Sequence, residues 1–405
     1  MGLFKKLISS VMGSIDDDTK KGLEEKVGSL KKGIGGVMDA SNAAKEFLQR
    51  KSAKGNTEGA AEDQKSSGEV LGADFLDDDE ENAIPEDAVL REDDHFKKCS
   101  KINIQNVAMI DENVFDGYKK LEEVCLSDSI RVIGNYAFYS CENLTEVHIN
   151  SSSRLEVIGE NAFAGCKMKA FNFPHRLKVI EESAFFECEK LEKVDLSRCV
   201  KLKAIKDKTF SGCCKLKFVQ FPVGLQKIGR EAFSDCELSN VVIPDSVEEI
   251  GTNAFLNCED LNSLILPHHL HTINTLSENK ISLSELDMSR CTELKEINCF
   301  LGDFEDLEQL VVPRNVEIIR TRELIKGDDL EAVFVPETLK VLELKHASYD
   351  IYCFSPKLES LLGLSEIKGT LYVKPEFFDD YRQQAETEGV DVEIKEMPDS
   401  KLKMY

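Results

Sequence analysis

The sequence predicts a solenoid of stacked parallel β-strands, preceded by a helical arm and an acidic linker. The first observation is a Phe-x-x-Cys pair that recurs every 22 to 25 residues through the middle of the chain. The second is a short apolar strand pattern that follows each pair and continues after the Phe and Cys positions decay. One repeat of this length cannot bury its own apolar side, so neighbouring repeats must stack to form a common core.

Residues 1–53 are expected to form an amphipathic helical arm. Apolar residues recur at helical spacing, and a weak coiled-coil seam over residues 17–51 is interrupted by several glycines. Lys5 and Lys6 lie beside apolar residues within the first 15, which is compatible with a weak peripheral contact with a membrane surface. The preferred interpretation is an ordinary amphipathic helix that packs on a partner.

Residues 54–95 are expected to form a flexible, disordered linker. The stretch is rich in Gly, Ser and Glu, and residues 61–95 hold 14 acidic and 2 basic side chains. The whole chain has a formal charge of −24, which argues against nucleic acid as a partner because that affinity comes from neutralising phosphates. The sequence has no run of 18 apolar residues, so it predicts no transmembrane segment.

Residues 96–373 are expected to form the solenoid, with about ten to eleven repeats. The shared template is Ile-x-x-x-Ala-Phe-x-x-Cys-x-x-Leu-x-x-Val-x-Ile, and its clearest copy runs from Ile133 to Ile149. A period of this length with one short strand is typical of a leucine-rich-repeat solenoid. The Phe and Cys positions should point inward. They are Phe115, Phe138, Phe163, Phe185, Phe210, Phe233 and Phe255, and Cys141, Cys166, Cys188, Cys213, Cys236 and Cys258.

The repeated cysteines are expected to be reduced core residues that form a Cys ladder. Neighbouring strands of a sheet lie about 4.8 Å apart with parallel side chains, whereas a disulfide needs Cβ atoms about 3.8 Å apart. Free thiols in this number fit a reducing compartment, so the predicted location is cytoplasmic. The alternative is a cell-surface or secreted protein exported without a recognisable signal peptide.

The template closely resembles the BspA-type leucine-rich repeat, in which Ile-Gly-x-x-Ala-Phe-x-x-Cys precedes Leu-x-x-Val-x-Ile-Pro. Variant repeats beginning at Asp195 and Asp287 look similar to that family as well. So does the unit from Leu371 to Tyr381, which is expected to be a strand followed by a helix; residues 374–405 are interpreted as a capping helix and tail. The resemblance implies a binding role, because family members are commonly surface or secreted binding and adhesion proteins of bacteria and protists.

We expect no catalytic residues, no cofactor and no metal site. His268, His269 and His271 form the densest group of imidazoles, but they follow a strand where surface polar residues are common. A catalytic cysteine needs an exposed thiolate beside a base, whereas the ladder thiols are predicted to be buried. The sequence also contains no G-x-S-x-G motif and no phosphate-binding loop.

A protein-binding face is predicted on the outward side of the strands, where alternate residues should meet solvent. Apolar residues at such positions mark either an interaction site or a face covered by the protein's own chain, for which the N-terminal helix or decayed repeats are candidates. We therefore expect a non-enzymatic scaffold that binds an unidentified protein; the alternatives are an exported cell-surface adhesin and, less favoured, an enzyme. The candidate residues are Phe218, Val242, Ile265, Val311 and Phe334.

Overall fold

The computed structural model describes residues 89–91 and 94–403, and the following statements concern these residues. The predicted arm (1–53), with its coiled-coil seam and membrane contact, lies outside them, as does most of the predicted linker (54–95). Within the described part, no helix is long and apolar enough to cross a membrane.

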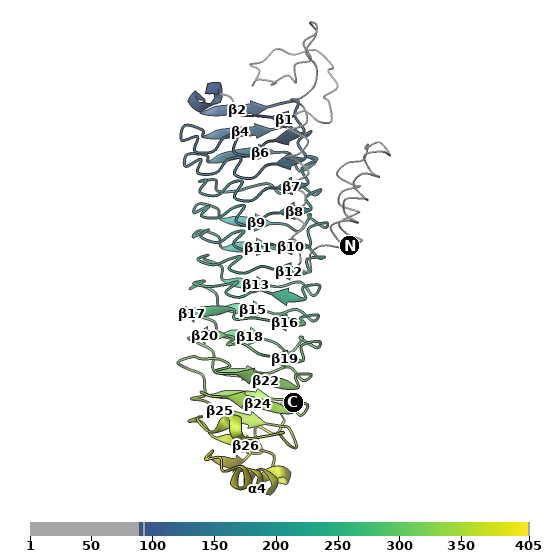
Figure 1. Ribbon diagram of the computed structural model, residues 1–405, viewed down its shortest axis with the longest axis vertical. Coiled ribbons are helices and arrows are strands. Elements are labelled where there is room, and N and C mark those ends of the chain that lie inside the picture. Colours follow the sequence, from purple (N-terminus) through teal and green to yellow (C-terminus); the bar gives the residue numbers. More distant parts are fainter. Residues whose placement is uncertain (1–88, 92–93, 404–405) are drawn as a thin grey trace, which may run out of the picture. The chain divides into compact units, whose positions relative to one another are not determined.

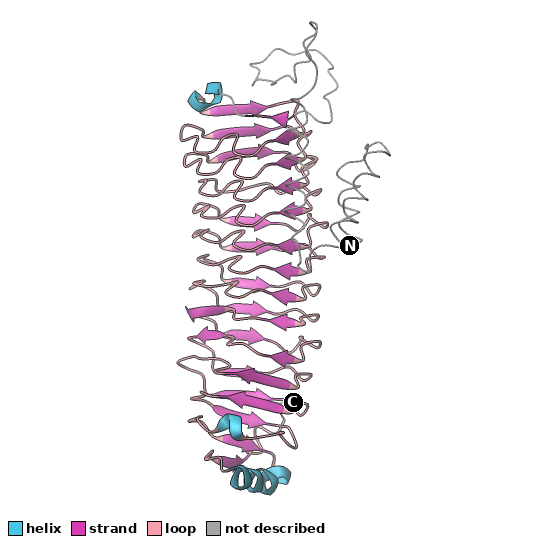
Figure 2. Cartoon of the chain, in the orientation of Figure 1, coloured by secondary structure: helices cyan, strands magenta, loops and turns pink. Residues whose placement is uncertain are grey.

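The described residues form a parallel β-solenoid of about 13 turns, which confirms the predicted fold class (Figure 1). Its strands form two series of parallel pairs (Figure 2). The front strands are β2 (Lys101–Ile104), β4 (Glu123–Leu126), β6 (Glu146–Ile149), β9 (Lys193–Asp195), β11 (Phe218–Gln220), β13 (Asn240–Val242), β15 (Ser263–Ile265), β18 (Glu285–Asp287), β21 (Gln309–Val311), β23 (Ala332–Val335), β25 (Asp350–Cys353), β26 (Leu371–Val373) and β27 (Ile394–Glu396).

The back strands are shorter, and most contain two residues. They are β1 (Val89–Leu90), β3 (Met109–Ile110), β5 (Val132–Ile133), β7 (Val157–Ile158), β8 (Val179–Ile180), β10 (Ala204–Ile205), β12 (Lys227–Ile228), β14 (Glu249–Ile250), β16 (Thr272–Ile273), β19 (Glu296–Ile297), β22 (Ile318–Thr321) and β24 (Val341–Leu344). A side pair is formed by β17 (Ser277–Ile281) and β20 (Gly302–Phe304), and short helical turns are η1 (Asp94–Lys98), η2 (Leu362–Leu364) and η3 (Pro375–Phe377).

Stacked strands extend further than the range 96–373 expected from the template. At the start, β1 lies inside the expected linker, where the apolar pair Val89–Leu90 pairs with β3. At the other end, β27 pairs with β26 after the chain has passed through helix α4 (Phe378–Glu388). The solenoid therefore has more turns than the ten to eleven that the Phe and strand pattern indicates.

The core consists of the apolar positions of the template. In β6, Val147 and Ile149 are buried while Glu146 and His148 are exposed, as the strand alternation predicts. The seven predicted Phe side chains are fully buried, and successive rings stack with centroids 4.9 to 6.0 Å apart. Within this Phe column, from Phe115 to Phe255, each inner ring stacks on the rings of both neighbouring turns.

The Cys ladder lies beside the Phe column and is also buried. Each ladder thiol donates a hydrogen bond to the backbone carbonyl of the Phe one turn earlier, for example Cys166 to Phe138 and Cys188 to Phe163, with S···O distances of 3.1 to 3.4 Å along the ladder. Burial raises the pKa of Cys188 and Cys258 to about 12. All 13 cysteines lie in the described part of the chain, and none forms a disulfide there.

Tight turns before and after each Phe place residues in left-handed backbone conformations. Two residues after the Phe, Gly165 and Gly212 both have φ of 76°, while Glu187 at the same template position has φ of 55°. Glycine adopts this conformation without a steric penalty, whereas other L-residues are strained there by about 1–2 kcal/mol. The turn between Phe185 and Cys188 is therefore locally strained.

Candidate functional site

The structure divides the five predicted binding residues into two groups. Val242 and Ile265 are directly paired on β13 and β15, and Phe218 lies on β11, which contacts β13. Val311 and Phe334 are paired on β21 and β23, and β18, with the polar outward residues Glu285 and Asp287, precedes them. The first group we call the apolar patch (Phe218, Val242 and Ile265).

The apolar patch meets solvent on three front strands. Phe218 is 46% exposed and Val242 is 61% exposed, while Ile265 is half-buried. The Nζ atom of Lys193 lies 5.1 Å from the centre of the Phe218 ring, so a cation covers part of one aromatic face. The other outward residues on β11 and β13 are polar, Gln220 and Asn240. Phe218 precedes the buried residue of its strand, whereas Val242 and Ile265 follow theirs, so the patch extends over both outward columns of the sheet.

Phe334 does not meet solvent, and the expectation that it lies on an exposed face is wrong. It is 0% exposed and belongs to a cluster with Tyr352, Phe354 and Met397. Lys401 lies 5.3 Å from the centre of its ring. Val311 is half-buried and packs against the same cluster.

Among the described residues, those of the C-terminal tail cover Phe334, with Met397 buried in the cluster and Leu402 packed against it. Met397 follows β27 and is hydrogen-bonded through its N–H to Val373, which sets the tail beside the front strands. Beneath it, Phe334, Tyr352 and Tyr372 form a stacked column with centroid distances of 4.8 and 4.7 Å. The outward aromatic residues of these last strands therefore pack under the tail and stabilise the fold, and Val311 packs at the edge of this cluster.

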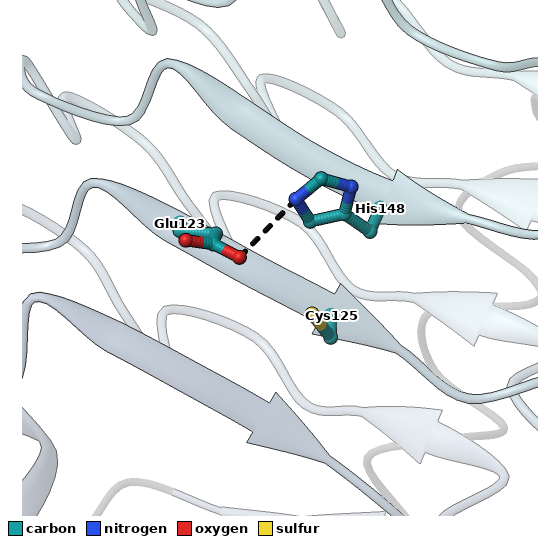
Figure 3. A group of neighbouring side chains, drawn as sticks. All are labelled: Glu123, Cys125 and His148. Atoms are coloured by element: carbon teal, nitrogen blue, oxygen red, sulfur yellow. Dashed lines mark ion pairs between the residues drawn. The ribbon is translucent and has the colours of Figure 1, made fainter.

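At the opposite end of the solenoid, the front strands carry a polar group that includes a thiol. Glu123 and Cys125 lie on β4, and His148 lies on β6 directly opposite Cys125 (Figure 3). One ligand atom of each residue lies within 4.8 Å of the others, and this is the one such group of three or more His, Cys, Asp or Glu residues among those described. The parallel register brings these three side chains to the same face.

Charged neighbours hold this group in place. Nε2 of His148 lies 3.2 Å from Oε1 of Glu123 and 3.2 Å from Oε2 of Glu146. The second oxygen of Glu123 pairs with Lys101 on β2, and hydrogen bonding from that ammonium lowers the pKa of the carboxyl group. Burial raises the pKa of the Cys125 thiol. The alternation of the strands places Glu123, Cys125 and His148 on the outward side, but their convergence depends on the side-chain orientations, which the sequence does not give.

The histidines at positions 268, 269 and 271 each contact a carboxylate. His268 contacts Asp245 at 3.0 Å. Glu293 contacts both His269 and His271, at 3.1 and 3.2 Å. These three imidazoles are thus partnered by carboxylates on neighbouring turns.

Comparison with known repeats identifies the family. The model of the BspA-type leucine-rich repeat region matches residues 83–192, 108–238, 151–262, 190–303 and 226–349, which together extend over more than half of the chain. The chain belongs to the BspA-type leucine-rich repeat family. This confirms the resemblance carried by the Ala-Phe-x-x-Cys template.

Several solved leucine-rich repeat and related structures are similar to this chain. A leucine-rich cell-surface protein of Faecalibacterium prausnitzii is 20% identical, with 67% of this chain and 87% of that one covered and a TM-score of 0.40. A leucine-rich repeat protein of Bacteroides ovatus is 21% identical, with coverages of 80% and 100% and a TM-score of 0.31. The pneumococcal vaccine antigen PcpA is 18% identical, with coverages of 76% and 83% and a TM-score of 0.37. No curated protein matches the chain.

Proposed function

We propose that this BspA-type protein is a non-enzymatic scaffold that binds a protein partner through the apolar patch. The observation that carries the proposal is the exposure of Phe218 and Val242 on regular strands whose other outward residues are polar. Outward strand positions that face water normally alternate to polar residues, and a contiguous apolar surface often marks an interaction site. Aromatic side chains are also enriched among the residues that dominate binding energy.

The stacked strands make the patch a rigid surface. The central residue of each of the three strands is buried in the solenoid core; these residues are Val219, Val241 and Leu264. A side chain held by a regular strand loses little conformational freedom on binding, which favours affinity. Phe218 and Val242 can therefore contact a partner without rearrangement of the turns that carry them.

A non-enzymatic role is supported by the burial of the ladder thiols. The ladder cysteines are buried and donate to backbone carbonyls, and burial raises the pKa of Cys188 and Cys258 to about 12. A nucleophilic cysteine requires an accessible thiolate. These side chains serve the stacking of turns instead.

Mutation of the patch tests the proposal. The full-length chain and its Phe218→Ala/Ile265→Ala variant are used as baits in lysate of the source cell, and captured proteins are quantified by mass spectrometry. At least one protein should fall tenfold or more in recovery with the variant. The matched control is Leu362→Ala, since Leu362 is 60% exposed on η2 next to the back strand β24.

The thermal unfolding midpoint separates binding from folding. Both variants should unfold within a few degrees of the unmodified chain, because the substituted side chains are partly exposed. Equal capture by the patch variant and the unmodified chain would refute the apolar patch as the binding surface. A large drop in unfolding midpoint for the patch variant alone would show that these side chains stabilise the fold.

An exported cell-surface adhesin is the second candidate, and membership of the BspA-type family favours it over a cytoplasmic scaffold. The two candidates share the binding face and differ in location. Fractionation of source cells with an antibody against the chain, followed by protease treatment of intact cells, distinguishes them. Degradation on intact cells supports the adhesin, whereas protection until lysis supports the cytoplasmic scaffold.

A further inference from the structure

We infer that Glu123, Cys125 and His148 form a binding site for a divalent transition-metal ion of the zinc class. The three residues supply a carboxylate oxygen, a sulfur and an imidazole nitrogen from two adjacent front strands, and their ligand atoms all lie within 4.8 Å of one another. Zinc in proteins takes these ligand types in tetrahedral arrangements. Nothing in the binding of a protein by the apolar patch requires this group.

The distance between the nitrogen and oxygen ligands fits an ion bound by both, and the sulfur lies within 4.8 Å of each. Ligand atoms held about 2.0 Å from a tetrahedral ion lie about 3.3 Å from one another, and a sulfur at about 2.3 Å lies slightly further from the other two. Nε2 of His148 and Oε1 of Glu123 are 3.2 Å apart, close to that separation.

The charged residues around the site are compatible with binding of a divalent cation. Lys101 pairs with Oε2 of Glu123, so it can stay in place while Oε1 binds the ion. Glu146 lies 3.2 Å from Nε2 of His148 and adds a second carboxylate at the margin of the site. Two carboxylates and a thiol, which loses its proton on binding a metal, compensate the charge of a divalent ion.

The backbone presets the arrangement. Cys125 is paired directly with His148, and Glu123 is paired with Glu146, in a run of four paired residues between β4 and β6. Strands in such a ladder lie about 4.8 Å apart, so the ligands start within reach and need only side-chain rotation. Figure 3 shows the three side chains on two adjacent strands. Three protein ligands would leave the fourth position of a tetrahedral ion free for water.

Cobalt(II) is the probe, because it binds in zinc sites and its thiolate complexes absorb light through charge transfer. The full-length chain is reduced, treated with a chelator and desalted, then titrated with cobalt(II) alone and next with zinc. We expect a thiolate-to-cobalt band that saturates at one equivalent and disappears when zinc displaces the cobalt. Carboxylates elsewhere in this acidic chain do not produce that band.

Variants assign the band to its residues. Cys125→Ser should abolish it, and His148→Gln should weaken zinc binding at least tenfold in competition with a chromophoric chelator. Two controls should leave the band unchanged: Cys214→Ser, which removes an exposed thiol, and His269→Gln/His271→Gln, which removes the imidazoles bound to Glu293. Circular dichroism of each variant without metal checks that the strands are retained.

Each result of these experiments either supports or overturns the metal site. A band that persists in Cys125→Ser, or a chain that gives no thiolate band at any cobalt concentration, overturns the site. Zinc should also raise the unfolding midpoint of the unmodified chain and not that of folded Cys125→Ser, because a ligand stabilises the state that binds it. An equal rise in both proteins would place the zinc elsewhere and likewise overturn the site.

Discussion

Replacing Phe185 by Leu should destabilise the solenoid more than the same replacement at Phe255. Both side chains are fully buried and occupy the same template position, so the loss of apolar volume is similar. Phe185 stacks on Phe163 and Phe210 at 5.4 and 5.5 Å, and its edge contacts Phe171 and Phe173 at 5.1 and 5.4 Å.

Phe255 contacts one aromatic ring among the described residues, Phe233 at 6.0 Å. An aromatic pair contributes about 0.5–1.5 kcal/mol beyond the burial of its area. Phe185 makes three more aromatic pairs than Phe255. We therefore expect Phe185→Leu to lower the free energy of unfolding by about 1.5–4.5 kcal/mol more than Phe255→Leu does. Both variants carry the same substitution at a fully buried position, so the difference between them reports the contacts between rings.

Guanidinium unfolding followed by far-UV circular dichroism measures this difference, since the chain has no Trp to report by fluorescence. The two variants should show different midpoints, with the lower one for Phe185→Leu. Equal losses would refute the reasoning and show that burial alone, rather than contact between rings, sets the contribution of the Phe column. A larger loss at Phe255 would indicate that the turns where the template decays limit stability.

Further predictions concern thiols, backbone strain and the tail. Because burial raises the pKa of Cys188 from 9.0 to about 12, the unfolded chain loses that proton first, and the free energy of unfolding should fall between pH 9.0 and about 12, less steeply in Cys188→Ala. Iodoacetamide should label Cys214 in the native protein and leave Cys188 unlabelled in peptide mass spectrometry. Glu187→Gly should raise the free energy of unfolding by about 1 kcal/mol and Glu187→Val should lower it, as unfolding curves would show. Deleting residues 397–405 should uncover Phe334 and increase the fluorescence of an added hydrophobic dye, whereas unchanged dye binding would show that other residues form the cover.

The periodic part of the fold could be predicted from the sequence because the spacing decides which residues stack. Once Phe138 and Phe163 occupy the same template position, their rings must meet in neighbouring turns. The thiol hydrogen bonds were not predictable, since the template places Cys166 inward without saying which carbonyl its sulfur faces. The outcome is a Cys ladder that links the turns as well as filling space.

The exposure of the candidate residues could be predicted where the template is regular. It could not be predicted where a segment outside the repeats packs over the strands. Phe218 and Val242 meet solvent as their alternation indicates. Phe334 obeys the same alternation but is covered by a tail whose sequence carries no repeat signal. Likewise, Cys125 and His148 become neighbours through strand register, and only their side-chain orientations bring Glu123 within reach of both.

The hydrogen bonds from each ladder thiol to the preceding turn have a mechanical consequence. Tension applied to the two ends of the stack loads these contacts in series, so the weakest turn yields first and its neighbours hold until the force rises again. Each released turn of 22 to 25 residues adds about 70–80 Å of extended chain, after subtraction of the spacing between strands. Under load the solenoid would therefore lengthen in discrete, nearly equal steps, and each step would dissipate work while the remaining turns kept their side chains in place.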